Sequence, residues 1–178
     1  MKTRILIVFT IMFIGLAHSG FDNENNFLAK ANEISLELTP HYNIEELSIK
    51  IKDVDSGSAE ARRYFYKYVI ILDYGKLQNF SENQLKGLLA HEMAHLEYYS
   101  DKNYVEVIFL ALRYLTSPQF RTYIEREADY TAIKKGFGEE LLDYRIHRIE
   151  TASNKDLEIL KEHYLSPDEI ILMLNKSL

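Results

Sequence analysis

Two histidines and a glutamate interrupt the apolar stretch GLLAHEMAHLEYY, which covers residues 87–99. His91 and His95 are four residues apart, so a helix would place their rings one above the other on one face, where two imidazoles can bind one metal ion. Glu92 directly follows the first histidine, and a carboxylate at that position can act as general base toward a metal-bound water. The alternative is that all three are ordinary core or surface residues.

The neighbours of Glu92 favour the metal site over that alternative. Neither lysine nor arginine stands three or four residues from it. On a helix, one apolar face would be formed by Leu85, Leu89, Met93 and Leu96, so the helix is predicted to be buried on several sides. A buried charge without a partner is costly, and a metal ion would remove that cost.

A second set of candidate ligands lies in TYIEREADYTA, residues 122–132. Glu125 and Asp129 are four residues apart, so one carboxylate can bind the metal while the other, a turn later, hydrogen-bonds the outer nitrogen of a ligand histidine. Taken alone, the charged residues of this stretch are more typical of a solvated helix face. The case for a metal site therefore depends on the two stretches together.

Each candidate residue falls on a predicted helix. Ser81 is a suitable N-cap for a helix that runs to about Tyr99, and Ser117-Pro118 begins another that ends near Gly136. Residues 101–115 between them are predicted to be helical. Because Val105–Leu112 is the most apolar internal run, we expect a core helix there, with a membrane-resting or substrate-groove element as the alternative.

The remaining pattern completes an α+β prediction, mostly α. Helices are also predicted at 27–38, 139–149 and 155–165, and a last short helix begins at the capping box of Ser166 and Glu169. Alternating residues at Leu47–Ile51 and the aromatic and β-branched run Tyr64–Leu72 predict two strands. We expect these strands to pair as a small antiparallel sheet.

The first nineteen residues are typical of an export signal. Lys2 and Arg4 precede the apolar run Ile5–Leu16, which is too short for a membrane helix, and Ala17-His18-Ser19 resembles a cleavage site. The prediction is therefore a signal peptide at 1–19, one domain at 20–178 with no membrane span after signal removal, and a periplasmic or secreted location. An uncleaved membrane anchor is the alternative.

Charge and composition exclude several function classes. After removal of residues 1–19 the chain has 19 basic against 27 acidic residues, a net charge of −8, and no basic stripe. Nucleic acid and anionic membrane surfaces are therefore poor partners. The chain has no cysteine, which excludes cysteine nucleophiles and cysteine-based zinc sites.

Taken together, the two motifs resemble the peptidase M48 family, which includes the Ste24-type CAAX proteases and the bacterial heat-shock and outer-membrane-quality proteases. The likeness runs from about residue 69 to residue 170 and rests on His91-Glu-Met-Ala-His95 followed by Glu125-Arg-Glu-Ala-Asp129. It implies a zincin-like (gluzincin) domain built around an active-site helix. It also implies one Zn²⁺ per chain bound by His91, His95 and Glu125, with Glu92 as catalytic base and Asp129 hydrogen-bonded to a ligand histidine.

The sequence departs from the family pattern in two places. The segment beginning at His163, HYLSPDEI, resembles the family's His-Pro segment, but its proline is displaced and the usual arginine is absent. Tyr64–Tyr68 stands where members often have a glycine-rich segment. His163 is the candidate that would stabilise the anionic reaction intermediate.

The expected function is that of a zinc-dependent endopeptidase, which hydrolyses peptide bonds of protein or peptide substrates with a metal-activated water. We expect an extended substrate to pair with the strand Val69–Leu72. The alternative is a latent or non-catalytic exported zinc-binding protein with a chaperone-like or partner-binding role. Glu92 discriminates between the two, since a structural zinc site needs no acid beside its first ligand. Substrate preference and oligomeric state do not follow from the sequence.

Overall fold

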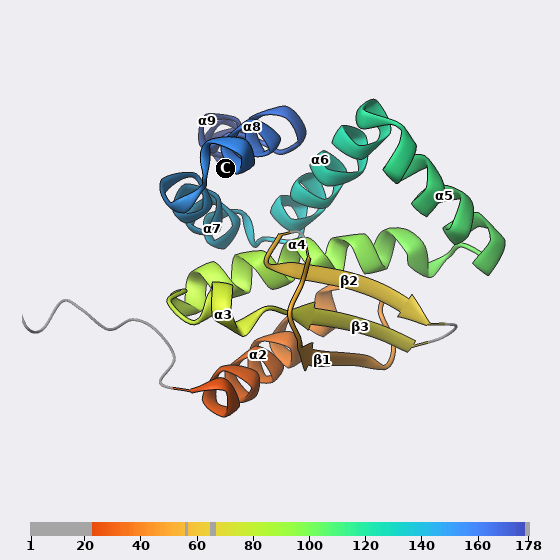
Figure 1. Cartoon of the computed structure of the whole chain (residues 1–178), viewed down its shortest axis with the longest axis horizontal. Coiled ribbons are helices and arrows are strands. Elements are labelled where there is room, and N and C mark those ends of the chain that lie inside the picture. Colours follow the sequence, from red (N-terminus) through yellow and green to blue (C-terminus); the bar gives the residue numbers. More distant parts are fainter. Residues whose placement is uncertain (1–22, 56, 65–66, 177–178) are drawn as a thin grey trace, which may run out of the picture.

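The computed structural model describes residues 23–55, 57–64 and 67–176, so the predicted signal peptide lies outside the described residues. The described chain is mostly helical with one small sheet, as predicted (Figure 1). Its elements are α2 (Glu24–Leu38), η1 (Thr39–His41), β1 (Leu47–Ile51), β2 (Ala59–Tyr64), β3 (Lys67–Leu72), α3 (Tyr74–Leu77), α4 (Glu82–Ser100), α5 (Tyr104–Thr116), α6 (Pro118–Lys134), α7 (Gly138–Thr151), α8 (Asn154–His163) and α9 (Pro167–Lys176).

The sheet is mixed, so the predicted antiparallel pair is wrong. Its strand order is β1-β3-β2, in which β1 runs parallel to β3 with Ile49 opposite Ile70 and β2 runs antiparallel to β3 with Ala61 opposite Ile70. Strand β2, with the sequence AEARRY, was not predicted because it has no β-branched residue. Alternation shows which face of a strand is buried and does not show the direction of its neighbour.

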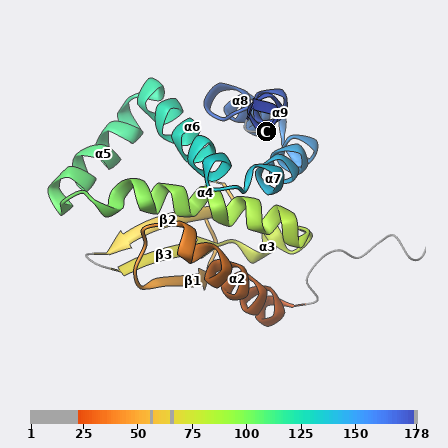
Figure 2. The ribbon, with the colours of Figure 1, turned by 180° about the vertical axis from the view of Figure 1, so that it is seen from behind.

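The main core lies between the sheet and helix α4. In Figures 1 and 2, α4 crosses the middle of the molecule, with the sheet and α2 on one side of it and α5–α9 on the other. One apolar cluster joins Phe27 of α2, Ile70 of β3, Leu89 of α4 and Leu141 of α7, and all four side chains are fully buried. Helix α4 is thus covered on several sides, as its sequence predicted.

The predicted helix starts are confirmed by their caps. The Ser81 hydroxyl accepts from Gln84 N at 3.2 Å, and the Gln84 side chain accepts from Ser81 N at 3.0 Å. A second capping box links Ser166 and Glu169 at the start of α9. The short helix α3, capped by Asp73, was not predicted because it lasts a single turn.

A close helix crossing fixes α4 against α7. Gly87 of α4 lies against the backbone of Glu140 and Leu141, and a Cβ atom at this position would overlap the Glu140 carbonyl group. Glycine is therefore required at the crossing for steric reasons, and the crossing sets the position of the α4 turn that carries His91.

Helix α5 is exposed, so the prediction of a core helix for Val105–Leu112 is wrong. None of its residues is buried, and it packs mainly on α6. Figure 1 shows it projecting from the end of α4 to the start of α6. Apolar residues surround much of this helix, but the body covers only one side of it. In the described part of the chain, no helix is both long and apolar enough to cross a membrane.

Candidate metal site

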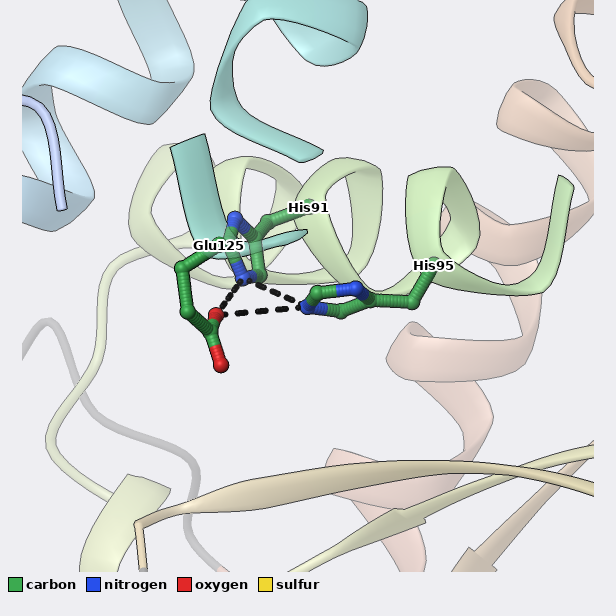
Figure 3. Close-up of side chains that lie close together, drawn as sticks. All are labelled: His91, His95 and Glu125. Carbon is green, nitrogen blue, oxygen red and sulfur yellow. Dashed lines mark hydrogen bonds and ion pairs between the residues drawn. The ribbon is translucent and has the colours of Figure 1, made fainter. Parts of the chain in front are cut away.

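Helices α4 and α6 bring His91, His95 and Glu125 together (Figure 3). The Nε2 atoms of the two histidines are 3.1 Å apart, and Oε2 of Glu125 lies 3.2 Å from His91 Nε2 and 3.3 Å from His95 Nε2. His91 and Glu125 are buried, and His95 is partly buried. Three potential ligand atoms thus converge on one point, and the group could hold a metal ion.

The separations fit a small tetrahedral ion. A zinc ion with ligands at about 2.0–2.1 Å sets neighbouring ligand atoms about 3.3–3.4 Å apart. The observed 3.1–3.3 Å is close to that value. Two imidazole nitrogens and one carboxylate oxygen also suit zinc, although other transition ions accept the same donors.

Asp129 orients the first histidine. Its Oδ1 lies 2.8 Å from His91 Nδ1, and the aspartate is fully buried. Since an aspartate accepts, His91 donates from Nδ1, which leaves the lone pair of Nε2 directed at the other two candidate ligands. The two carboxylates that share a helix face thus have different positions, with Glu125 among the ligand atoms and Asp129 behind His91.

The charges of the site favour a cation between these groups. Burial disfavours protonation of His91, but its hydrogen bonds with Asp129 and Glu125 outweigh burial and raise the pKa of His91 well above the usual value. Burial likewise opposes ionisation of Glu125, yet the two histidines lower the pKa of this carboxyl well below its usual range. A metal ion bound to Nε2 and Oε2 would supply the positive charge that a proton otherwise supplies.

Glu92 is buried beside the candidate ligands. Among the described residues, no basic side chain forms an ion pair with it, as its sequence neighbours suggested. Burial raises the pKa of Glu92, and the nearby His95 and His91 oppose that rise. A carboxyl group with a raised pKa holds a transferred proton more readily than an ordinary carboxyl group does, which suits a general base.

Two contacts around the ligands were not predicted from the sequence. The Tyr114 hydroxyl of α5 donates a hydrogen bond to Oε1 of Glu125, the oxygen that faces away from the histidines. Arg145 of α7 donates from Nη2 to both oxygens of Asp129, at 2.8 and 2.9 Å. No motif marks either residue. The sequence shows only that Arg145 falls on an amphipathic helix. This position does not reveal which side chain Arg145 contacts.

His163, the last residue of α8, contacts Thr122 of α6. Its Nδ1 is 2.8 Å from the Thr122 hydroxyl, one turn before Glu125, and its side chain is buried. The next residue is the one that approaches the site, since the Tyr164 ring centroid lies 5.8 Å from that of His91. A role for His163 in stabilising an intermediate stays a prediction.

The prediction that an extended substrate pairs with the strand Val69–Leu72 is wrong. Strand β3, which contains Val69–Leu72, lies in the middle of the sheet with its two sides paired to β1 and β2. The outer position that faces α4 belongs to the unpredicted strand β2. A hollow of ≈ 630 Å³ lies along β1 and β3 and has none of the candidate ligands in its lining. Another hollow, of ≈ 100 Å³, lies beside His95 between α4 and α6.

Comparison of the chain with protein-family models, with curated proteins and with solved structures finds no match. The protein is therefore described by its own fold and candidate site. It is an α+β protein, mostly α, with a His/His/Glu group that could hold a metal ion.

Proposed function

We propose that the protein is an exported zinc-dependent endopeptidase with a zincin-like domain, similar to the M48 peptidases. The observation that carries this proposal is the convergence of His91, His95 and Glu125 from two helices, with Glu92 buried next to the first ligand. A purely structural zinc site has no use for an acid beside its first ligand. Residues 1–19 would serve as the export signal.

Each residue of the site would have a separate role in the reaction. Bound zinc would supply an acidified water and a Lewis acid for the scissile carbonyl. Glu92 would take the proton of the attacking water and return it to the leaving amine, which its raised pKa supports. Asp129, held by Arg145, would keep His91 in the tautomer that presents Nε2 to the ion.

Strand β2 is the element that would receive the substrate. It is an outer strand of the sheet and packs beside α4, the helix that carries His91 and Glu92. An extended peptide can add to such a strand through main-chain hydrogen bonds, and it would then run past the candidate metal site. Main-chain recognition of this kind predicts modest sequence selectivity.

The deciding experiment combines metal content with cleavage. We expect mass spectrometry to find one zinc per chain in the wild type and in Glu92→Gln, because the substituted side chain is not a ligand. Casein cleavage should be chelator-sensitive in the wild type and about 10³-fold slower in Glu92→Gln, a loss typical of removing a catalytic base. Glu82→Gln, in the exposed first turn of the same helix, is the matched control and should keep full activity.

The other outcomes are equally informative. Zinc in both proteins with no cleavage in either would favour the latent or partner-binding alternative. Full activity of Glu92→Gln would exclude Glu92 as the base. A chain that takes up no metal under any condition would overturn the proposal as a whole.

A further inference from the structure

Helix α5 presents an apolar stripe to solvent. Five large side chains at helical spacing form it, and their residues are 53–81% exposed. They are Val105 60%, Ile108 53%, Phe109 66%, Leu112 56% and Leu115 81%. With 100° per residue, the stripe is centred on the side of the helix opposite Val107, Leu110 and Tyr114, which are the apolar residues turned toward the body. The stripe therefore points away from the rest of the molecule.

Exposure on this scale indicates a binding surface. Single exposed apolar residues are normal, but a contiguous stripe along one helix marks an interaction site. The surface is also convex, because it is one face of a projecting helix (Figures 1 and 2). A convex stripe fits another helix or a flat surface better than it fits an extended peptide.

The charges that flank the stripe indicate which kind of partner would bind there. Glu106 and Arg113 are both exposed and are seven residues apart, which places them on the same side of the stripe two turns apart. Their midpoint lies between residues 109 and 110, close to the centre of the stripe. If two copies of α5 pair antiparallel about a two-fold axis at that point, each Glu106 lies opposite Arg113 of the partner subunit. The pairing thus forms two ion pairs along the edge of an apolar contact.

Both charged side chains are already ordered for this role. Oε2 of Glu106 accepts a hydrogen bond from Asn103 N at 2.7 Å in the capping box of α5. The Arg113 guanidinium lies 4.3 Å from the centroid of the Phe120 ring. Side chains that are ordered before association lose less entropy when they pair.

A membrane surface fits the same stripe less well. Helices that lie in a membrane interface typically carry lysine and arginine along the polar face. Here the flank has one acid and one base, and the whole chain has a net charge of −6. The charge pattern therefore favours a second copy of the chain over a lipid surface.

We propose that the protein forms a two-fold homodimer through antiparallel pairing of α5. A stable dimer buries roughly 800 Å² on each partner. The five exposed side chains of the stripe would contribute the apolar part of such a contact. Because the contact is one helix wide, the dissociation constant is expected on the order of 10 μM. The dimer does not depend on the peptidase proposal, because no candidate ligand lies in the stripe.

Sedimentation velocity of the purified chain from 1 to 500 μM, a range set about the expected constant, tests the dimer. We expect concentration-dependent dimerisation of the wild type and an increase of about 100-fold or more in the dissociation constant of Leu112→Glu, which buries a charge in the stripe. Leu36→Glu is the matched control, since Leu36 is a comparably exposed leucine on α2, and it should dimerise as the wild type does. A wild type that stays monomeric up to 500 μM would overturn the proposal.

A charge exchange tests the antiparallel register. Arg113→Glu and Glu106→Lys should each weaken the dimer about fivefold to tenfold, and the double variant should return to within about threefold of the wild type. Circular dichroism checks that α5 keeps its helix in each variant. A double variant no stronger than the singles would refute this register. Flotation of monomeric wild type with phosphatidylcholine vesicles, lost in Leu112→Glu, would assign the stripe to lipid and overturn the dimer.

Discussion

Asp129 accepts hydrogen bonds at both carboxylate oxygens although it is fully buried. Oδ1 accepts from His91 and Arg145, and Oδ2 accepts from Arg145 and from the backbone N–H of Leu165 at 2.9 Å. Burial opposes ionisation, but the charge of Arg145 and the hydrogen bond with His91 lower the pKa of Asp129. The carboxylate is thus held ionised and in one orientation, which in turn fixes the ring of His91.

Arg145 should contribute to both stability and metal affinity. It is 1% exposed, so Arg145→Met removes one partner of a buried ion pair, at a cost of about 3–5 kcal/mol in the free energy of unfolding. With Asp129 held by fewer hydrogen bonds, zinc affinity should fall roughly 10–100-fold. Urea unfolding and competition with a chelating dye measure the two effects. Arg62→Met, which removes an exposed pair with Glu60, should change stability by less than about 1 kcal/mol.

Tyr114 should affect the metal more than the fold. Tyr114→Phe removes the hydrogen bond to Oε1 of Glu125, and hydrogen bonds to charged groups contribute about 1.5–3 kcal/mol. We therefore expect zinc affinity to fall about tenfold or more, read from chelator competition, with helix content unchanged. Tyr123→Phe, at an exposed tyrosine of α6, is the control. Equal affinities for Tyr114→Phe and wild type would show that Glu125 needs no such support.

Residues that share a helix are related by fixed spacings in the sequence. His91, Glu92 and His95 are separated by fixed helical spacings, as are Glu125 and Asp129, so their shared faces follow from the pattern. The contacts of Tyr114 and Arg145 arise from packing between helices, which leaves no periodic trace. Contacts between helices were predicted only where the family resemblance supplied them, as for His91, His95 and Glu125.

At the scale of the elements, the crossing of α4 and α7 leaves no room for a side chain at Gly87. A methyl group there would overlap the Glu140 carbonyl, so Gly87→Ala must push two backbones apart. Overpacking of this kind costs about 1–3 kcal/mol, which outweighs the gain in helix propensity from alanine. Because α4 carries two candidate ligands, a shift of this helix should also weaken zinc binding.

Thermal unfolding of Gly87→Ala measures that cost. The comparison is Gly75→Ala in α3, where the new Cβ would meet only the Asp73 side chain, at 3.4 Å. We expect Gly75→Ala to change stability by less than about 1 kcal/mol in either direction. If both variants were equally stable, α4 and α7 would have to be able to separate without loss.

Among the features of the helices and strands, some were predicted from the sequence and others were not. Helix starts were predicted correctly at Ser81, Ser117 and Ser166, because each start is marked by a capping residue next to it. The direction of β1 relative to β3 was not predicted correctly, because strand pairing is a contact between residues that are distant in the sequence. The exposure of α5 was missed for the same reason, since hydropathy does not show how much of a helix the rest of the protein can cover.

At the scale of the whole molecule, a bound ion would join two helices that pack on each other, of which α4 makes the contacts with the sheet. Helix α4 packs on β2, α2 and α7, whereas α6 packs on α4, α5, α7 and α8. An ion that binds only when both helices are in place stabilises the folded state by mass action, by about 2.7 kcal/mol at a hundredfold excess over its dissociation constant.

Zinc should therefore raise the midpoint of thermal unfolding. For a domain of this size the expected rise is roughly 5–10 °C, reversed by chelator. Magnesium should produce no rise, because it prefers oxygen ligands. Glu125→Gln should lose most of the rise, and Glu127→Gln, two residues away, should keep it. An identical midpoint with and without zinc would contradict metal binding between α4 and α6.

The strand order β1-β3-β2 has a consequence for the path of folding. Strands β2 and β3 are neighbours in sequence and antiparallel, so little chain entropy is lost when they meet. Strand β1 pairs with β3 across the intervening β2 segment and gains its partner only when β3 is in place. His91 and Glu125 are 34 residues apart and lie on different helices, so they meet only when α6 packs on α4. The metal site would then be among the last parts of the chain to form, so zinc should slow unfolding more than it speeds folding.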